Sequence, residues 1–223
     1  MENWSHGFRP LTHFFRCPNN VLDFYEVVKY VSSQANNLCI DPSRIAIAGE
    51  SGGGYICAGT MVQLAREEKA NLVKLAIPII PMLSDYSFTD KTAMTREEAE
   101  NAIGQQKLWR LIAGPNVGNV MLKIFQTILL QMTALSKDAL LFPDKVEERT
   151  LSKMPPTIIW EAEFDIFLTE ACRFANRLRA AGRLLELVVI PGAKHGSGMS
   201  PICGCFKTER EAWRMAVHEY LIK

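Results

Sequence analysis

Hydrophobic residues near the start of the chain recur at the spacing of an amphipathic helix. Residues 20–37 predict this helix, and its apolar face is formed by Val21, Phe24, Val27, Val28 and Val31. The helix-breaking sequence Asp41-Pro42-Ser43 follows, and residues 44–48 (RIAIA) then form a short, continuous apolar run. A run of this length predicts a β-strand that is covered on both faces.

A glycine-rich turn at residues 49–54 (GESGGG) joins this strand to a second helical pattern, which continues through residues 55–64. Another apolar run at residues 73–80 predicts the next strand. The order strand, tight turn, helix, strand is typical of α/β folds with a parallel sheet. The first third of the chain therefore predicts an α/β unit.

A long segment without a strand pattern comes next. Residues 85–150 contain helical patterns at 95–111 and 117–135, separated by Gly114-Pro115. Because helical patterns dominate here and no alternating or β-branched run is present, the segment predicts a helical, cap-like insertion over the sheet.

The chain returns to the α/β pattern after this insertion. Residues 157–160 and 184–190 predict two further buried strands, and residues 168–181 predict the helix between them. A last helix is expected at residues 207–221. Since neither a repeat nor a flexible linker interrupts the pattern, residues 1–223 are expected to form one domain with a mostly parallel sheet flanked by helices.

The composition and net charge of the chain exclude several classes of protein and of binding partner. Apolar residues make up 48% and charged residues 22% of the chain, which excludes a disordered protein. The net charge of +1 gives no electrostatic basis for a nucleic-acid or anionic-membrane partner. The N-terminus lacks a signal-peptide pattern, and Lys123 and two glutamines interrupt the apolar residues 120–135. We therefore expect a cytoplasmic protein with no integral membrane segment.

The six cysteines are expected to be free thiols, since no secretory signal indicates an oxidising compartment. Cys203-Gly204-Cys205 follows His195 closely and raises the question of a metal site. Its spacing differs from the C-x-x-C of zinc sites, and no second cysteine pair is present. The sequence therefore predicts neither a metal nor another cofactor.

Candidate chemistry begins with Gly49-Glu50-Ser51-Gly52-Gly53, which fits the pattern G-x-S-x-G at the junction of a predicted strand and helix. In a nucleophile elbow, a serine occupies a strained strand-to-helix turn, and the flanking glycines make room for it. We therefore interpret Ser51 as a nucleophile. The alternative is a glycine-rich strand-to-helix turn in which the serine has no catalytic role.

A serine hydroxyl needs a base, and the base needs an orienting acid. Asp165 follows the third predicted strand, and His195 follows the fourth in a glycine-rich loop. Because the carboxyl ends of parallel strands lie along one edge of the sheet, both side chains are expected to converge on Ser51. Glu161 and Glu163 are rival acids, although Glu161 lies close to the strand itself.

Several short motifs occur in a fixed order: DFY (23–25), DPSRIA (41–46), GESGG (49–53), MPPT (154–157), FD (164–165), RLRAAG (177–182) and PGAKHG (191–196). With these motifs the chain resembles, from about residue 18 to residue 199, the hormone-sensitive-lipase-like esterases of α/β-hydrolase fold 3. The resemblance implies cofactor-free hydrolysis of small carboxylic esters. It makes Ser51 the nucleophile, His195 the base and Asp165 the orienting acid.

The chain departs from this family in its oxyanion hole and in its length. The usual alanine after the nucleophile is Gly52 here, which retains the backbone N–H needed as an oxyanion donor. The family's upstream His-Gly-Gly segment, which supplies the other donors, has no counterpart before Ser51. The family also has more strands before the nucleophile than fifty residues can supply. We therefore expect an N-terminally truncated fold, in which residues 44–48 form an exposed edge that favours self-association.

Two functions follow from these observations. The first is a serine hydrolase that cleaves carboxylic esters through an acyl-enzyme intermediate. The alternative is a catalytically impaired hydrolase-fold fragment that acts as an interaction protein through its sheet edge or its insertion. A peptidase or a thioesterase would use the same triad, so the triad alone does not separate these activities.

Overall fold

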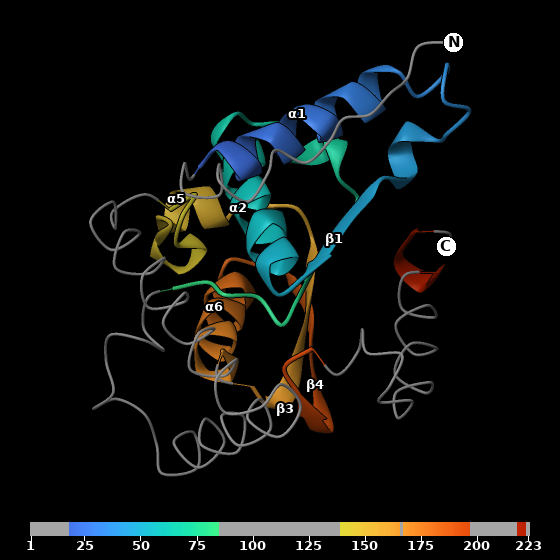
Figure 1. Cartoon of the computed structure of the whole chain (residues 1–223). Coiled ribbons are helices and arrows are strands. Elements are labelled where there is room, and N and C mark those ends of the chain that lie inside the picture. The colour runs from blue at the N-terminus through green and yellow to red at the C-terminus, as the bar shows by residue number, and fades with distance from the viewer. Residues whose placement is uncertain (1–17, 85–138, 166, 197–217, 222–223) are drawn as a thin grey trace.

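The computed structural model describes residues 18–84, 139–165, 167–196 and 218–221 (Figure 1). Within these ranges, one sheet contains the strands Ala46–Glu50 (β1), Leu75–Ile79 (β2), Thr157–Phe164 (β3) and Leu184–Lys194 (β4). The strands lie in the order β1-β2-β3-β4, and each neighbouring pair is parallel. This arrangement confirms the predicted α/β class with a parallel sheet.

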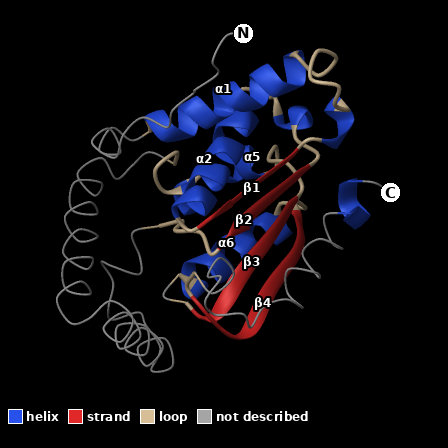
Figure 2. Cartoon of the chain, turned by 45° about the vertical axis from the view of Figure 1, so that its right-hand side comes forward, coloured by secondary structure: helices blue, strands red, loops and turns tan. Residues whose placement is uncertain are grey.

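The main helices are Asn19–Ser33 (α1), Gly52–Arg66 (α2) and Leu168–Ala180 (α6), with the short helix Glu148–Leu151 (α5) beside them. Short 3-10 turns lie at Pro42–Arg44 (η2), Ala70–Leu72 (η3) and Pro143–Lys145 (η5). Helices α2 and α6 pack on one face of the sheet, and α1 packs against α2 on the same side (Figure 2). On the other face, Tyr220 and Leu221 pack against alternate strand residues, including Ile158 and Trp160. Both faces of the central strands are therefore covered, as their continuous apolar sequences require.

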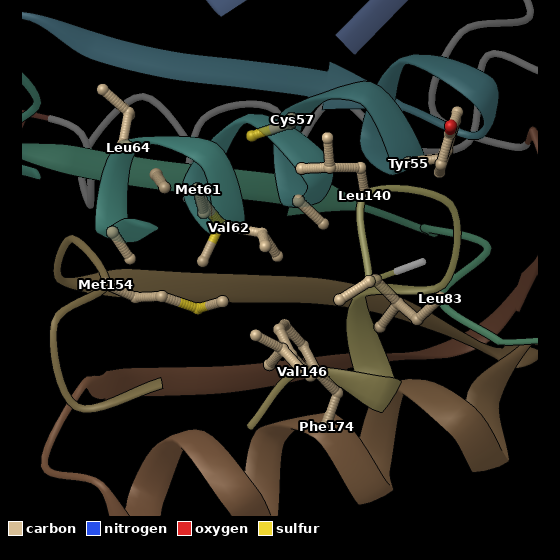
Figure 3. Packing of buried hydrophobic residues seen from close by; sticks show 14 of the residues in the cluster. Tyr55, Cys57, Met61, Val62, Leu64, Leu83, Leu140, Val146, Met154 and Phe174 are labelled. Atoms are coloured by element: carbon tan, nitrogen blue, oxygen red, sulfur yellow. The ribbon is translucent and has the colours of Figure 1, made fainter. Parts of the chain in front are cut away.

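Helix α2 lies at the centre of the core because nearly all of the residues on its buried side are apolar and of small or medium size. Ten of its fifteen residues are buried. Figure 3 shows Met61 and Val62 of α2 in the same packed cluster as Met154 and the α6 residue Phe174. Each of these four side chains is fully inaccessible to solvent. This packing fixes α2, and with it the turn that connects α2 to β1.

The strand ends differ from the sequence-based prediction in ways that matter for the site. β1 starts at Ala46 rather than at residue 44, because Pro42–Arg44 forms a 3-10 turn. The Asp41 carboxylate stabilises that turn by accepting hydrogen bonds from the Ser43 N–H and from Arg44 Nε. β3 and β4 extend four residues beyond their predicted ends, to residues 164 and 194. The two longer strands therefore end immediately before Asp165 and His195.

Much of the predicted insertion at residues 85–150 lies outside the described residues, which resume at residue 139. Of the predicted last helix at 207–221, the structure describes residues 218–221, and these are helical. The predicted first helix ends at Ser33, four residues earlier than expected. Within the described part of the chain, β1 pairs with β2 alone and forms one edge of the sheet.

Candidate active site

Ser51 occupies a strained turn between β1 and α2. Its backbone angles are φ 54° and ψ −115°, in the positive-φ half of the map, which residues with a side chain rarely adopt. The turn is held on both sides, because the Ser51 N–H donates to the Ile79 carbonyl (2.9 Å) and the Ser51 carbonyl accepts from the Tyr55 N–H (3.0 Å). The Ser51 side chain does not cap α2. Its hydroxyl is therefore available to another partner.

Glycine is required at the end of β1 because the turn folds back tightly. A Cβ atom added to Gly49 would lie 2.2 Å from the carbonyl oxygen of Gly53 and 2.4 Å from its carbonyl carbon. By contrast, a Cβ added to Gly52 or Gly53 would meet no atom within 4 Å. The close backbone approach of the elbow thus depends on the first glycine of the motif.

His195 is brought to the site by an irregularity in β4. Ala162 pairs with Ile190, whereas Phe164 pairs with Lys194, so β4 contains two more residues than β3 over this stretch. The extra residues include Gly192, whose positive φ of 73° suits glycine and whose N–H donates to Glu163 Oε2 (2.6 Å). Bulges of this kind redirect the chain that follows them. His195 is the first residue after the strand.

The structure brings Ser51, His195 and Asp165 together in one hydrogen-bonded chain. Ser51 Oγ lies 2.8 Å from His195 Nε2, and His195 Nδ1 lies 2.7 Å from Asp165 Oδ2. Because an ionised carboxylate can only accept, His195 Nδ1 carries the proton and Nε2 accepts from the serine hydroxyl. The Asp165 side chain is fully inaccessible to solvent, and the His195 side chain is 15% exposed. The arrangement can transfer a proton from Ser51 to His195.

Phe167, which the sequence analysis did not identify, contacts both Asp165 and His195. Its backbone N–H donates to Asp165 Oδ1 (3.0 Å). Its ring packs edge-on against the His195 ring, with the centroids 5.3 Å apart and the planes at 74°. No sequence periodicity marks this residue, since its role depends on the loop between β3 and α6.

The rival acids occupy different places. Glu163 binds the bulge in β4 through the Gly192 N–H, so its carboxylate is used there. Glu161 is buried within β3, and its Oε1 accepts from the N–H of Ala162 (3.1 Å). Burial, followed by the charge of Asp165, holds the pKa of Glu161 well above its usual range. Of the three carboxyls, Asp165 makes the contact with His195.

Two further features bear on the chemistry of the site. Gly52 is the first residue of α2, and N–H groups in the first turn of a helix have no intrahelical acceptor. Its N–H is thus a candidate donor to a developing oxyanion, as the sequence suggests. Burial raises the pKa of the neighbouring Glu50, and the interaction with His195 opposes this shift. Among the described residues, no cluster of histidine, cysteine and acidic side chains could hold a metal ion.

Comparison with known proteins identifies the family of this fold. Residues 14–199 match the profile of the alpha/beta hydrolase fold. The chain belongs to the alpha/beta hydrolase fold family. This membership confirms the resemblance and the fold class inferred from the sequence motifs.

Relatives of this hydrolase-family chain include esterases. Carboxylesterase NlhH of Mycobacterium tuberculosis is 29% identical over 181 residues, which cover 80% of this chain and 51% of the relative. Esterase Est22 has a similar structure (TM-score 0.65, 22% identity), with 92% of this chain and 56% of that chain covered. A thermostable esterase from Pseudomonas putida ECU1011 gives a TM-score of 0.69 at 20% identity, covering 92% and 59%. The two structural similarities establish the fold.

The chain spans about half the length of the curated carboxylesterase that it matches. No helix in the described part of this hydrolase-family chain has the length and hydrophobicity needed to cross a lipid bilayer.

Proposed function

We propose that this chain is a serine hydrolase that cleaves small carboxylic esters, with Ser51 as nucleophile, His195 as general base and Asp165 as orienting acid. The observation that carries the proposal is the hydrogen-bonded chain from Ser51 Oγ through His195 to Asp165, with distances of 2.8 and 2.7 Å. The carboxylesterase relative supports an ester as the substrate class.

The reaction proceeds in two steps that need no cofactor. Ser51 Oγ forms a bond to the ester carbonyl carbon while its proton moves to His195 Nε2. The tetrahedral intermediate then expels the alcohol, which takes the proton from His195 and leaves an acyl group on Ser51. His195 removes a proton from water while the water oxygen bonds to the acyl carbon; the bond to Ser51 Oγ then breaks, His195 returns the proton to Oγ, and the carboxylic acid leaves. Asp165 keeps the proton on Nδ1 and stabilises the imidazolium that forms in each step.

Stabilisation of the oxyanion sets the rate in this proposal. The Gly52 N–H supplies one donor at the N-terminus of α2, where the helix dipole also favours negative charge. The 223 residues contain no His-Gly-Gly sequence to supply the others. Loss of one oxyanion donor costs about 10²–10³-fold in turnover. We therefore expect the 223-residue chain, assayed alone, to be slower than a related esterase by about that factor.

Hydrolysis of p-nitrophenyl acetate, butyrate and octanoate, together with the corresponding anilides, tests the proposal. We expect ester turnover by the wild type and none above background by Ser51→Ala, whose fold is checked by circular dichroism. Equal turnover in the two proteins would contradict the assignment of Ser51. Preferential cleavage of anilides would replace the esterase with an amidase that uses the same triad.

Self-association through β1 is a further proposal. β1 bonds to β2 through its odd-numbered residues, since the Ile45 carbonyl and the Ser51 N–H both take part. The N–H and carbonyl of the exposed Ala48 therefore face the sheet edge. We expect dimers or larger species in light-scattering chromatography of the wild type, and a monomer for Ala48→Lys. A monomeric wild type would contradict this proposal. The cytoplasmic location expected from the sequence is likewise a proposal, to be tested by cell fractionation.

A further inference from the structure

Three carboxyl groups are buried together where β3 gives way to α6. Glu161 lies in β3, Asp165 follows this strand, and Glu170 lies in the first turns of α6. As whole residues, Glu161, Asp165 and Glu170 are 1%, 4% and 0% exposed. Asp165 has a role in the proposed mechanism, whereas Glu161 has none. Buried carboxylates are costly unless donors surround them, so the hydrogen bonds of each group indicate its protonation state.

The donors are distributed unequally among these groups. Glu170 accepts from the N–H groups of Leu83 (2.6 Å) and Ser84 (3.3 Å) and from the Ser84 hydroxyl (3.0 Å). Asp165 accepts from the Phe167 N–H and from His195 Nδ1, as described above. Both groups are thus surrounded by donors, as ionised carboxylates require.

Glu161 has fewer donors than either neighbour. Its Oε1 accepts one bond from the N–H of the next residue, Ala162 (3.1 Å). Its Oε2 is buried and has no hydrogen-bond partner among the described residues. The strongest electrostatic effects on it come from Asp165, at the end of its own strand, and from Glu170 on α6, both acidic. Among the described residues, the single Ala162 N–H is the donor that offsets a negative charge on Glu161, against burial and two acidic neighbours.

Protonation of Glu161 removes its buried negative charge and makes its carboxyl group a hydrogen-bond donor. Two carboxylates that face each other are both acceptors and cannot form a hydrogen bond. Once Glu161 is protonated, its buried Oε2, which otherwise has no partner among the described residues, becomes a donor, and we assign the Asp165 carboxylate as its acceptor. Burial and the charge of Asp165 both raise the pKa of Glu161, in agreement with this geometry.

We propose that Glu161 is a positioning residue that stays protonated and donates a hydrogen bond to the Asp165 carboxylate, which it holds in place for His195. The catalytic part of this inference rests on the proposed serine-hydrolase function, whereas the protonation state does not. The expected pH effects follow from the charge. When Glu161 loses its proton, Asp165 loses a donor and gains a negative neighbour, so the Asp165 carboxylate is held less firmly in place for His195.

The first arm of the test measures stability and needs no activity. Glu161→Gln retains an acceptor and a donor but cannot ionise. Because the folded-state pKa of Glu161 is raised, its bound proton stabilises the folded wild type fully below the unfolded-state pKa of about 4.3. This stabilisation is lost as pH rises through the folded-state pKa. Between the unfolded-state pKa and the higher folded-state pKa of Glu161, the Tm of wild type should therefore fall relative to that of Glu161→Gln by about 3–5 °C per pH unit.

The second arm measures the rate at which a fluorophosphonate labels Ser51 between pH 5 and pH 10. We expect Glu161→Gln to react within about threefold of wild type near neutral pH and to lack the alkaline decrease of the wild type. Glu161→Leu, which keeps the site filled but offers no donor, should react at least about tenfold more slowly. Glu163→Gln is the matched control, since it removes a carboxylate from the same strand and should retain the alkaline decrease.

Each result is decisive. If the Tm values of wild type and Glu161→Gln change in parallel with pH, Glu161 is an ordinary ionised carboxylate and the inference is wrong. If the Tm values diverge but the two labelling profiles coincide, Glu161 is neutral and does not position the triad. If the Tm values diverge and wild type labels at no pH, the serine-hydrolase function fails while the protonation of Glu161 stands.

Discussion

The two glycines that flank Ser51 are equivalent in the sequence motif, but the structure gives them different roles. A Cβ at residue 49 would lie 2.2 Å from the Gly53 carbonyl oxygen, and real Cβ contacts are almost never closer than 3.0 Å. The opposing atoms belong to the backbone, so relief requires a movement of about 1 Å in the elbow itself. Overpacking costs about 1–3 kcal/mol where side chains can adjust. We expect at least about 3 kcal/mol for Gly49→Ala.

This cost corresponds to a decrease in Tm of about 6–12 °C for a chain of this size. A displacement of about 1 Å between Ser51 Oγ and His195 should also slow reaction at Ser51 by about 10²-fold. Gly53→Ala is the matched control, because a Cβ there meets no atom within 4 Å. Alanine reduces the conformational entropy of the unfolded chain, so the Tm of Gly53→Ala should equal that of wild type or exceed it by up to a few degrees.

Thermal unfolding followed by circular dichroism and the rate of p-nitrophenyl acetate hydrolysis provide the two measurements. The reasoning is refuted if Gly49→Ala unfolds and reacts like the wild type. It is also refuted if both substitutions are equally damaging, because the close approach would then not be specific to the first glycine.

Three further predictions concern single side chains. Asp165→Asn should slow ester hydrolysis about 10³–10⁴-fold, since an amide at that position favours the wrong tautomer of His195; a smaller loss than tenfold would argue against its role. Burial raises the pKa of the Cys57 thiol to about 12, so peptide mapping after treatment with Ellman's reagent should find the exposed Cys39 modified and Cys57 intact in the folded protein. Glu170→Ala should lower the free energy of unfolding by about 2–4 kcal/mol in urea titrations, because buried donors after β2 lose their acceptor; an unchanged midpoint would contradict this.

Much of the fold follows from local sequence patterns. The apolar runs of β1 to β4 and the order of strands and helices identify a parallel sheet, and the carboxyl ends of its strands bring residues 51, 165 and 195 to one edge. The ends of the strands are less predictable. β1 starts late because the Asp41 side chain stabilises a turn, and β4 continues through a bulge in which Glu163 binds the Gly192 N–H. Both effects depend on contacts between side chain and backbone that hydrophobic periodicity does not encode.

The burial of Glu161 and its acidic neighbours could not be predicted from the sequence either. The sequence placed Glu161 close to a strand and ranked it below Asp165 as an acid. It could not indicate that Glu161 is 1% exposed or that Asp165 and Glu170 act on it. These relations arise from the packing of α6 on β3. The protonation state of a buried group therefore has to be inferred from three-dimensional neighbours.

Labelling of Ser51 tests the central claim most directly. Folded wild-type protein, treated with a fluorophosphonate at neutral pH and digested for mass spectrometry, should carry one adduct on the peptide that contains Ser51. Ser51→Ala should carry none, and His195→Ala should label at least about 10³-fold more slowly. A wild type that is folded by circular dichroism but shows no Ser51-dependent adduct would contradict the account.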